Sequence, residues 1–236
     1  MTAPPPAEKA GLIDDFLEIF TSPAKVFERR KGGDFFAPLA ILTVLAGIVI
    51  VASMGPISTL MDAEWPRIVA RAIAQNPQVT PAQMEQGRTM MAKVIPVIGT
   101  LSVPIAMICG GLILWLAGKL FGSVATVKDA MMVATWSWVP RVLQLIVVLV
   151  IMLLMDPAHM TGLFAPSVSV AHFLDPDSTP YKLLVFASRV DVFVIWQTVL
   201  LGIGLSVVGK IPRAQAYMAA ALTWLIGSGL ATMMQR

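Results

Sequence analysis

The residues with the strongest chemical implication in this sequence are three charged side chains inside long apolar stretches: Arg141, Arg189 and Asp191. An ionised side chain at the centre of a bilayer costs about 2.5–3.5 kcal/mol even on the scale from insertion experiments. Arg189 and Asp191 are two residues apart, so on a helix they point to different sides and pair poorly with each other. We therefore expect Asp191 to pair with Arg141 on a neighbouring helix, and Arg189 to reach the outer headgroups.

The predicted pair has two interpretations. It is a structural tie between two helices, or it is a proton-sensitive or substrate-contacting site in a transport path. Gln144 and Gln197 complete the candidate intramembrane polar site, because a conduit needs further polar side chains along its wall. An Arg141→Asp/Asp191→Arg variant, in which the two charges are exchanged, would test the pairing.

Signatures of catalysis are absent, since the sequence contains no HExxH, GxSxG, P-loop or CxxC pattern. Residues 227–229 (GSG) superficially resemble an intramembrane serine nucleophile, but such an enzyme needs a base, and the histidines lie in a loop on the far side. That loop also carries metal-ligating types, at a spacing that matches no ligand pattern: Asp156, His159, His172, Asp175 and Asp177. We expect no catalytic, cofactor-binding or metal-binding residues, and no enzyme.

Composition indicates a membrane protein. Of the 236 residues, 57% are hydrophobic and only 13% are charged, and the mean hydropathy is +0.78. A soluble domain carries about a quarter charged residues, which its solvated surface requires. The predicted fold class is therefore an all-α, polytopic integral membrane helical bundle, because only closed backbone hydrogen bonding survives in hydrocarbon. The net charge is +3, and most basic residues lie in short loops, where they predict the orientation of the protein in the membrane. This distribution does not indicate nucleic-acid binding.

Five stretches are long enough to cross a bilayer, which takes about 20 apolar residues per helix. The predicted membrane domain covers 35–235, and its transmembrane helices cover about 35–55, 94–118, 129–155, 183–209 and 213–235. Outer loops 56–93 and 156–182 connect them on one side. The first of these loops contains a predicted helix near 59–75 and a helix start at Thr80, where Thr-Pro-Ala-Gln matches the capping-box pattern.

The amino-terminal segment 1–34 is the predicted cytoplasmic tail. Within 11–31, apolar side chains such as Phe16 and Phe20 alternate with acidic ones such as Asp15 at helical spacing. Ser22-Pro23 predicts a new helix start, with serine as N-cap. We expect one or two short amphipathic helices lying on the membrane surface. Helices folded against the protein's own loops are the alternative.

Lysine and arginine set the predicted orientation. They are concentrated in the tail and in two tight links, 120–128 and 208–213, whereas on the other side they are spread over long loops. The positive-inside rule then places the amino terminus and both links in the cytoplasm, and an odd number of spans places the carboxyl terminus outside. The short links also predict two antiparallel hairpins, spans two and three and spans four and five.

Small residues recur at every fourth position in the last two spans. Gly202 and Ser206 form one such row, and Thr223, Gly227 and Ala231 form another. Rows of this kind let helix backbones approach closely in lipid. We expect these residues to mediate helix packing inside the bundle or, alternatively, self-association with another copy of the chain.

Several segments together resemble the Yip1 domain family, in its bacterial branch. Residues 20–27 (FTSPAKVF) are similar to the family's Pro-Xaa-Xaa-Xaa-Phe motif ahead of the first span, and 80–93 resemble the polar helix before the second. Residues 134–140 (ATWSWVP) resemble the aromatic-Ser-Xaa-Xaa-Pro stretch of the third span, and 191–205 resemble the fourth. The resemblance extends from about 16 to 230 and rests on the order and spacing of these motifs.

The resemblance implies five spans, a cytoplasmic amino terminus and, for a bacterial member, the inner membrane. Eukaryotic relatives are implicated in vesicle trafficking and contact small prenylated GTPases, but their amino-terminal Asp-Leu-Tyr-Gly-Pro-type motif is missing here, so no small-GTPase binding is expected. We expect a non-enzymatic protein of undefined biochemical activity that acts through membrane organisation or through protein and lipid interactions. The expected partners are membrane lipids, a second copy of the chain in a homo-oligomer or another membrane protein. The alternative is a small transporter or channel that uses Arg141 and Asp191.

Overall fold

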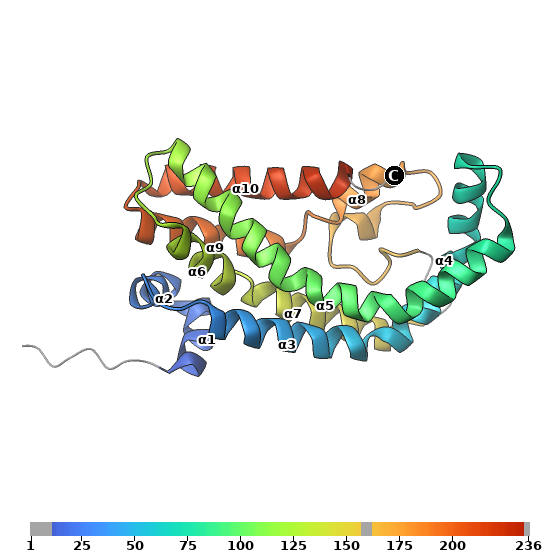
Figure 1. Cartoon of the computed structure of the whole chain (residues 1–236), viewed down its shortest axis with the longest axis horizontal. Coiled ribbons are helices and arrows are strands. Elements are labelled where there is room, and N and C mark those ends of the chain that lie inside the picture. Colours follow the sequence, from blue (N-terminus) through green and yellow to red (C-terminus); the bar gives the residue numbers. More distant parts are fainter. Residues whose placement is uncertain (1–10, 157–161, 234–236) are drawn as a thin grey trace, which may run out of the picture.

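The computed structural model describes residues 11–156 and 162–233, and every regular element in these ranges is a helix (Figure 1). Their bounds are α1 Leu12–Thr21, α2 Pro23–Arg30, α3 Phe36–Ala52, α4 Met54–Gln75, α5 Pro81–Leu120, α6 Val127–Trp136, α7 Val139–Leu154, the 3₁₀ helix η2 Val170–Phe173, α8 Tyr181–Ala187, α9 Val192–Gly209 and α10 Arg213–Met233.

The predicted fold class, an all-α integral membrane bundle, is confirmed. Four helical segments are each long and apolar enough to cross a membrane: α5, the α6–α7 pair, α9 and α10. The 17 residues of α3 extend only about 26 Å, slightly less than the hydrocarbon core. Together with α4, from which it is bent by 55°, α3 forms a fifth candidate. The described residues therefore contain four or five candidate spans.

Segments far apart in the sequence meet at one end of the bundle. Helices α1 and α2, the link between α5 and α6, and the link between α9 and α10 all lie there (Figure 1). The Val124 N–H donates to the Gly209 carbonyl at 3.1 Å, which joins the two links, and the Gly32 N–H donates to Asp129 Oδ1 at 3.0 Å. The turn between α4 and α5 and residues 162–180 lie at the opposite end. Which end faces the cytoplasm stays a prediction.

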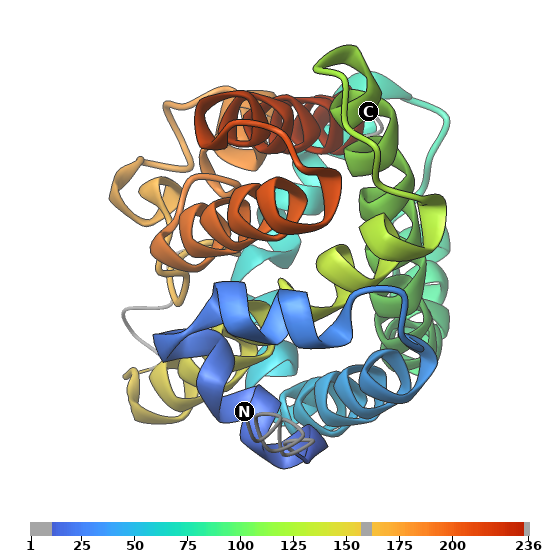
Figure 2. The same cartoon turned by 90° about the vertical axis from the view of Figure 1, so that its left-hand side faces the viewer.

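The two amino-terminal helices pack into the bundle, and α2 lies across its end beside α9 (Figure 2). Ile19, Val26 and Phe27 are completely buried, and the rings of Phe16 and Phe20 pack against Trp136 and Trp196. Part of the predicted apolar face therefore packs inside the protein, against the third and fourth spans, while Ile13 and Leu17 remain exposed. Contact of this exposed part with the membrane surface stays a prediction.

The third and fourth predicted spans differ in detail from the structure. The third span is interrupted at Ser137 and Trp138, where α6 ends and α7 begins with Pro140 in its first turn. The fourth begins at Val192 instead of 183, because α8 is a separate short helix. In the outer loop 56–93, the predicted helix near 59–75 is present as α4, which begins earlier, at Met54, and the predicted Thr80 capping box is confirmed at the start of α5.

The hydrophobic core lies where the amino-terminal helices meet α5, α6, α9 and α10. Its largest fully buried side chains include Trp136, Phe27, Leu205 and Leu114. Outside this core the helices expose long apolar side chains, among them Val97, Leu101, Leu116 and Leu225, which suits surfaces that face lipid.

Candidate functional site

The site is built around the start of α9, where Asp191 is the N-cap. Its backbone is extended, at φ −144° and ψ 166°, and its Oδ1 accepts hydrogen bonds from the N–H groups of Phe193 and Val194, both at 2.8 Å. The prediction of an aspartate inside a continuous fourth span is therefore wrong. A short acidic side chain binds the free N–H groups of a first helical turn, so it favours a helix start over a helix interior.

The second carboxylate oxygen of Asp191 faces α7. Arg141 Nη1 lies 3.6 Å from Asp191 Oδ2, and Gln144 Nε2 donates to the same oxygen at 2.9 Å. Gln144 lies one helical turn beyond Arg141 and accepts a hydrogen bond from its Nη1 through Oε1. The amide thus bridges the two charges. We call Arg141, Gln144 and Asp191 the polar cluster; it joins α7 to the start of α9.

The chain itself covers the Asp191 side chain completely and most of the rest of the polar cluster. Ser169 and Asp191 form an isolated antiparallel bridge, in which the Val170 N–H donates to the Val190 carbonyl at 3.0 Å. The side chain of Asp191 is 0% exposed and that of Arg141 is 22% exposed, with its guanidinium 5.9 Å from the Trp138 ring centroid. Both Asp191 oxygens already accept hydrogen bonds from the chain, so the cluster fits a structural contact between two helices better than an open binding site.

No hydrogen bond within the described residues joins the side chains of the other two predicted members, Arg189 and Gln197, to the polar cluster. Arg189 occupies the turn between α8 and α9, and its backbone carbonyl accepts a hydrogen bond from Trp224 Nε1 of α10 at 3.2 Å. Its expected side-chain contact with headgroups stays a prediction. Gln197 is half-buried further along α9.

Gly202 and Gly227 on the predicted small-residue rows have different surroundings. A Cβ at Gly202 would lie 2.3 Å from Cδ1 of Tyr217, so α9 and α10 approach closely there, and Ser206 Oγ donates to the Ile211 carbonyl at 3.2 Å. Thr223 is buried, whereas Gly227 is exposed and a Cβ there would meet nothing within 4 Å.

Ala231, the last residue of the second row, is half-buried. Packing inside the bundle is therefore wrong for Gly227, because the face of α10 that carries it is turned outward. Self-association through that face stays a prediction.

Ion-pair clusters at both ends of the bundle escaped the sequence reasoning. At the amino-terminal end, the completely buried carboxylate of Asp15 pairs with Arg29 and Arg30. At the opposite end, the almost buried Glu64 pairs with Arg67 and Arg71, and Arg67 also binds Asp177 of the outer loop. The hydrogen bond from Arg67 holds the pKa of the Asp177 carboxyl below its usual range. Sequence spacing gives little signal for such contacts, since the partners are up to 110 residues apart.

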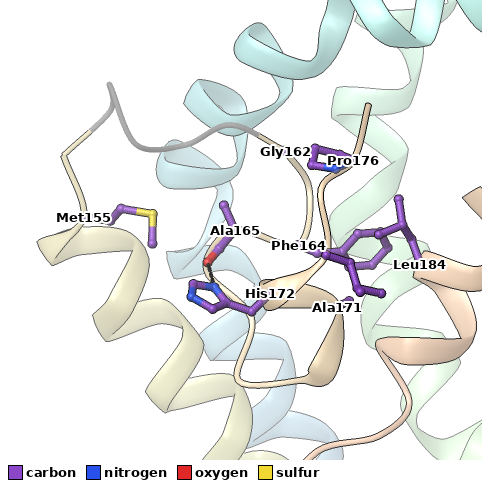
Figure 3. A pocket seen from close by; sticks show the side chains of 9 residues that line it. Met155, Gly162, Phe164, Ala165, Ala171, His172, Pro176 and Leu184 are labelled. Atoms are coloured by element: carbon purple, nitrogen blue, oxygen red, sulfur yellow. Dashed lines mark hydrogen bonds between the residues drawn. The ribbon is translucent and has the colours of Figure 1, made fainter. Parts of the chain in front are cut away.

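A cavity of about 170 Å³ lies in the outer loop region near His172 (Figure 3). Its lining is mostly apolar, with Phe164, Leu174 and Leu184 among the contributors, and His172 Nδ1 lies 2.7 Å from the Ala165 carbonyl oxygen. In the described part of the chain, no group of three or more metal-ligating side chains comes together. His159, the other histidine of this loop, lies outside the described residues.

Comparison with models of protein families identifies the family of this chain. The model of the Yip1 domain matches residues 17–234, which is nearly the whole chain. The chain belongs to the Yip1 domain family. Comparison with curated proteins and with solved structures gave no match. The family resemblance inferred from the sequence is thus confirmed, and with it an integral membrane protein, although nothing in the match fixes the bacterial branch or the membrane.

The segments that carry the resemblance form junctions in this Yip1 domain. Pro23 opens α2, and Phe27, four residues on, is buried so close to α9 that its Cζ would lie 3.1 Å from a Cβ at Gly204. Ser137 and Pro140 frame the break between α6 and α7, with Ser137 Oγ donating to the Val133 carbonyl at 2.7 Å. Asp191 caps α9. The motifs therefore mark where helices begin, break and meet.

Proposed function

We propose that this Yip1 domain protein works without catalysis, through contacts of its membrane-embedded surface with lipids and with other proteins. One observation carries the proposal. The polar cluster, which a transporter would need as its working site, has both oxygens of Asp191 engaged by groups of the chain itself. What the protein offers its surroundings is instead an extensive apolar helical surface.

The transport alternative would require more polar lining than the described residues provide. Discontinuous helices and a polar midplane are typical of secondary transporters. Here α8 and α9 are interrupted beside Asp191, but the bridge between Ser169 and Asp191 covers that break. Gln197 and Thr198 are the next polar residues along α9. The Thr198 hydroxyl donates to the Val194 carbonyl of its own helix at 2.8 Å. We therefore keep transport as the outcome that would overturn the proposal.

The proposal includes an orientation and a location. The amino-terminal helices and both tight links share one end of the bundle, and this end carries Arg29, Arg30, Lys31, Lys119, Lys128, Lys210 and Arg213. With the positive-inside rule, that end is proposed to face the cytoplasm of a bacterial cell, and the membrane to be the inner one. The proposed partners are membrane lipids, a second copy or another membrane protein, and neither a small GTPase nor nucleic acid.

Reconstitution into liposomes tests the proposal. We expect proton and ion flux to equal that of protein-free liposomes, and phospholipid or protein partners to remain bound when the protein is extracted in mild detergent. Flux above background that Asp191→Asn abolishes, and that the matched loop variant Asp175→Asn leaves intact, would establish transport instead. Reporter fusions at the amino terminus and at the link 208–213 test the orientation, which fails if either of them reports the outer side.

A further inference from the structure

An apolar groove lies between α4 and the first half of α5, at the end of the molecule opposite to α1 and α2. Its volume is about 210 Å³. Most of its floor is flexible apolar side chain, and its polar contributors are a serine, a tryptophan and one arginine. The lining residues are Met54, Ile57, Ser58, Met61, Trp65, Arg88, Met91, Ala92 and Ile95.

The groove is continuous with surface that faces lipid. It begins at Met54, directly after the 55° bend between α3 and α4, and reaches Ile95, where α5 enters its long apolar stretch. Met91 is 64% exposed, and the exposed apolar surface of α5 continues through Val97 and Ile98. An acyl chain could therefore pass from the bilayer into the groove without leaving an apolar environment, and methionine side chains adapt easily to such a chain.

The mouth of the groove carries both signs of charge. Arg88 lies 5.0 Å from the Trp65 ring centroid and forms an ion pair with Asp62 of α4, and its Nη1 lies 4.0 Å from Glu85. The Asp62 and Glu85 side chains are 63% and 61% exposed, so both carboxylates are accessible from outside. A guanidinium has five N–H donors in a fixed fork, so that Arg88 can bind a phosphate while it keeps a carboxylate partner.

The charges at the mouth of the groove favour one kind of lipid headgroup over another. One cation faces two carboxylates, which gives the mouth a local net charge of −1. A headgroup that carries only negative charge would meet repulsion from Asp62 and Glu85. A headgroup with an ammonium next to its phosphate matches both signs, because its phosphate can lie at Arg88 and its ammonium at the two carboxylates.

We propose that this groove binds a phospholipid with an ammonium-bearing headgroup, such as phosphatidylethanolamine. One acyl chain lies along the floor formed by Met61, Met91 and Ile95, with the phosphate at Arg88 and the ammonium at Asp62 and Glu85. This inference rests on the proposed function and deepens it, since it assigns a lipid class and a site to a protein proposed to act through membrane contacts.

Native mass spectrometry of the intact, detergent-purified protein, titrated with phosphatidylethanolamine or phosphatidylglycerol, tests the site. We expect phosphatidylethanolamine to bind at least about 5-fold more tightly than phosphatidylglycerol. Arg88→Gln should weaken phosphatidylethanolamine binding by about 10-fold or more, because a charge-assisted hydrogen bond is lost. Lys93→Gln removes a charge from the same helix outside the groove lining, and it should leave the binding unchanged.

Two further variants separate the headgroup from the groove. Asp62→Asn/Glu85→Gln removes the carboxylates, so its preference should shift towards phosphatidylglycerol. Ala92→Phe fills the groove and should weaken both lipids together. Thermal unfolding and size-exclusion chromatography of each variant establish that it is folded. A folded Ala92→Phe variant that binds lipid as the wild type does would refute the site. The site would also be refuted if the wild type is a dimer and Ala92→Phe makes it monomeric, because the groove would then hold a second copy of the chain.

Headgroup selectivity and the proposed function can fail separately. Equal binding of both lipids by the wild type would refute the ammonium assignment. If groove variants leave all lipid binding intact while the protein still retains phospholipid, the inference fails and the proposed function stands. If liposome flux depends on Asp191, the proposed function fails whatever the groove binds.

Discussion

The contacts of Asp191 in the polar cluster predict how much stability the protein loses when this residue is replaced, because Asp191 has two structural roles. It caps α9 through two backbone N–H groups, and its charge balances that of Arg141, with Gln144 hydrogen-bonded to both. Loss of an N-cap costs about 1 kcal/mol. Removal of one partner from a buried ion pair costs about 3–5 kcal/mol, and the 22% exposure of the Arg141 side chain favours the lower end. Asp191→Ala should therefore lower the free energy of unfolding by about 4 kcal/mol.

Asparagine separates the two roles. It caps helices about as well as aspartate, so Asp191→Asn should lose only the charge contribution, about 3 kcal/mol. In Arg141→Met/Asp191→Asn neither charge remains, and the double variant should lie within about 1 kcal/mol of the wild type, since a buried pair replaced as a unit is often neutral. The coupling energy between the two sites should thus be clearly favourable.

Reversible unfolding in mixed detergent micelles, followed by tryptophan fluorescence, measures these differences. The reasoning would be refuted if Asp191→Asn were as stable as the wild type, or if the double variant lost the sum of both single effects. Equal stability of the alanine and asparagine variants would refute the capping contribution alone. The charge exchange suggested by the sequence is a poor test, because an arginine at position 191 has no acceptor for the N–H groups of α9.

Three more outcomes follow from other parts of the fold. Gly202→Leu should destabilise the protein by about 1–3 kcal/mol, because its side chain would collide with Tyr217, while Gly227→Leu on the open face of α10 should be neutral in the same unfolding assay. Asp15→Asn should leave the two arginines beside it without their buried carboxylate, so limited proteolysis should cleave the amino-terminal helices faster than in the wild type. The pKa of Asp177 is lowered by its arginine partner, so the tie between the outer loop and α4 is present above the usual carboxyl pKa of about 4 and is lost as the pH falls below it. Hydrogen exchange of residues 174–180 should therefore be constant from pH 7 to about 5, after correction for the intrinsic rate, and increase at lower pH.

Much of the fold was predictable because its signals are local. Apolar length located α3, α5 and α10, and the Thr80 capping box located the start of α5. The pairing partner of Asp191 was inferred from the cost of an isolated charge in lipid, and Arg141 does lie 3.6 Å away. The helix boundary beside Asp191 was missed because apolar residues on both sides of 188–191 hide a break that depends on capping.

Long-range packing accounts for the remaining errors. The amphipathic pattern of α1 and α2 fits a membrane surface and a bundle equally well. The structure packs Phe16 and Phe20 against tryptophan rings of the bundle and leaves Ile13 and Leu17 exposed. Gly202 and Gly227 belong to similar small-residue rows, yet one touches Tyr217 and the other faces outward.

The helical class, the membrane location and the membership among Yip1 domains thus follow from the amino-acid order alone, because hydropathy, spacing and motif order are properties of the chain. Three features became visible only in the folded molecule: Gln144 bridges the two intramembrane charges, Asp15 is buried between arginines, and α4 and α5 form a groove with Arg88 at its mouth. These features depend on which helix faces meet, and that is set by packing among segments far apart in the chain.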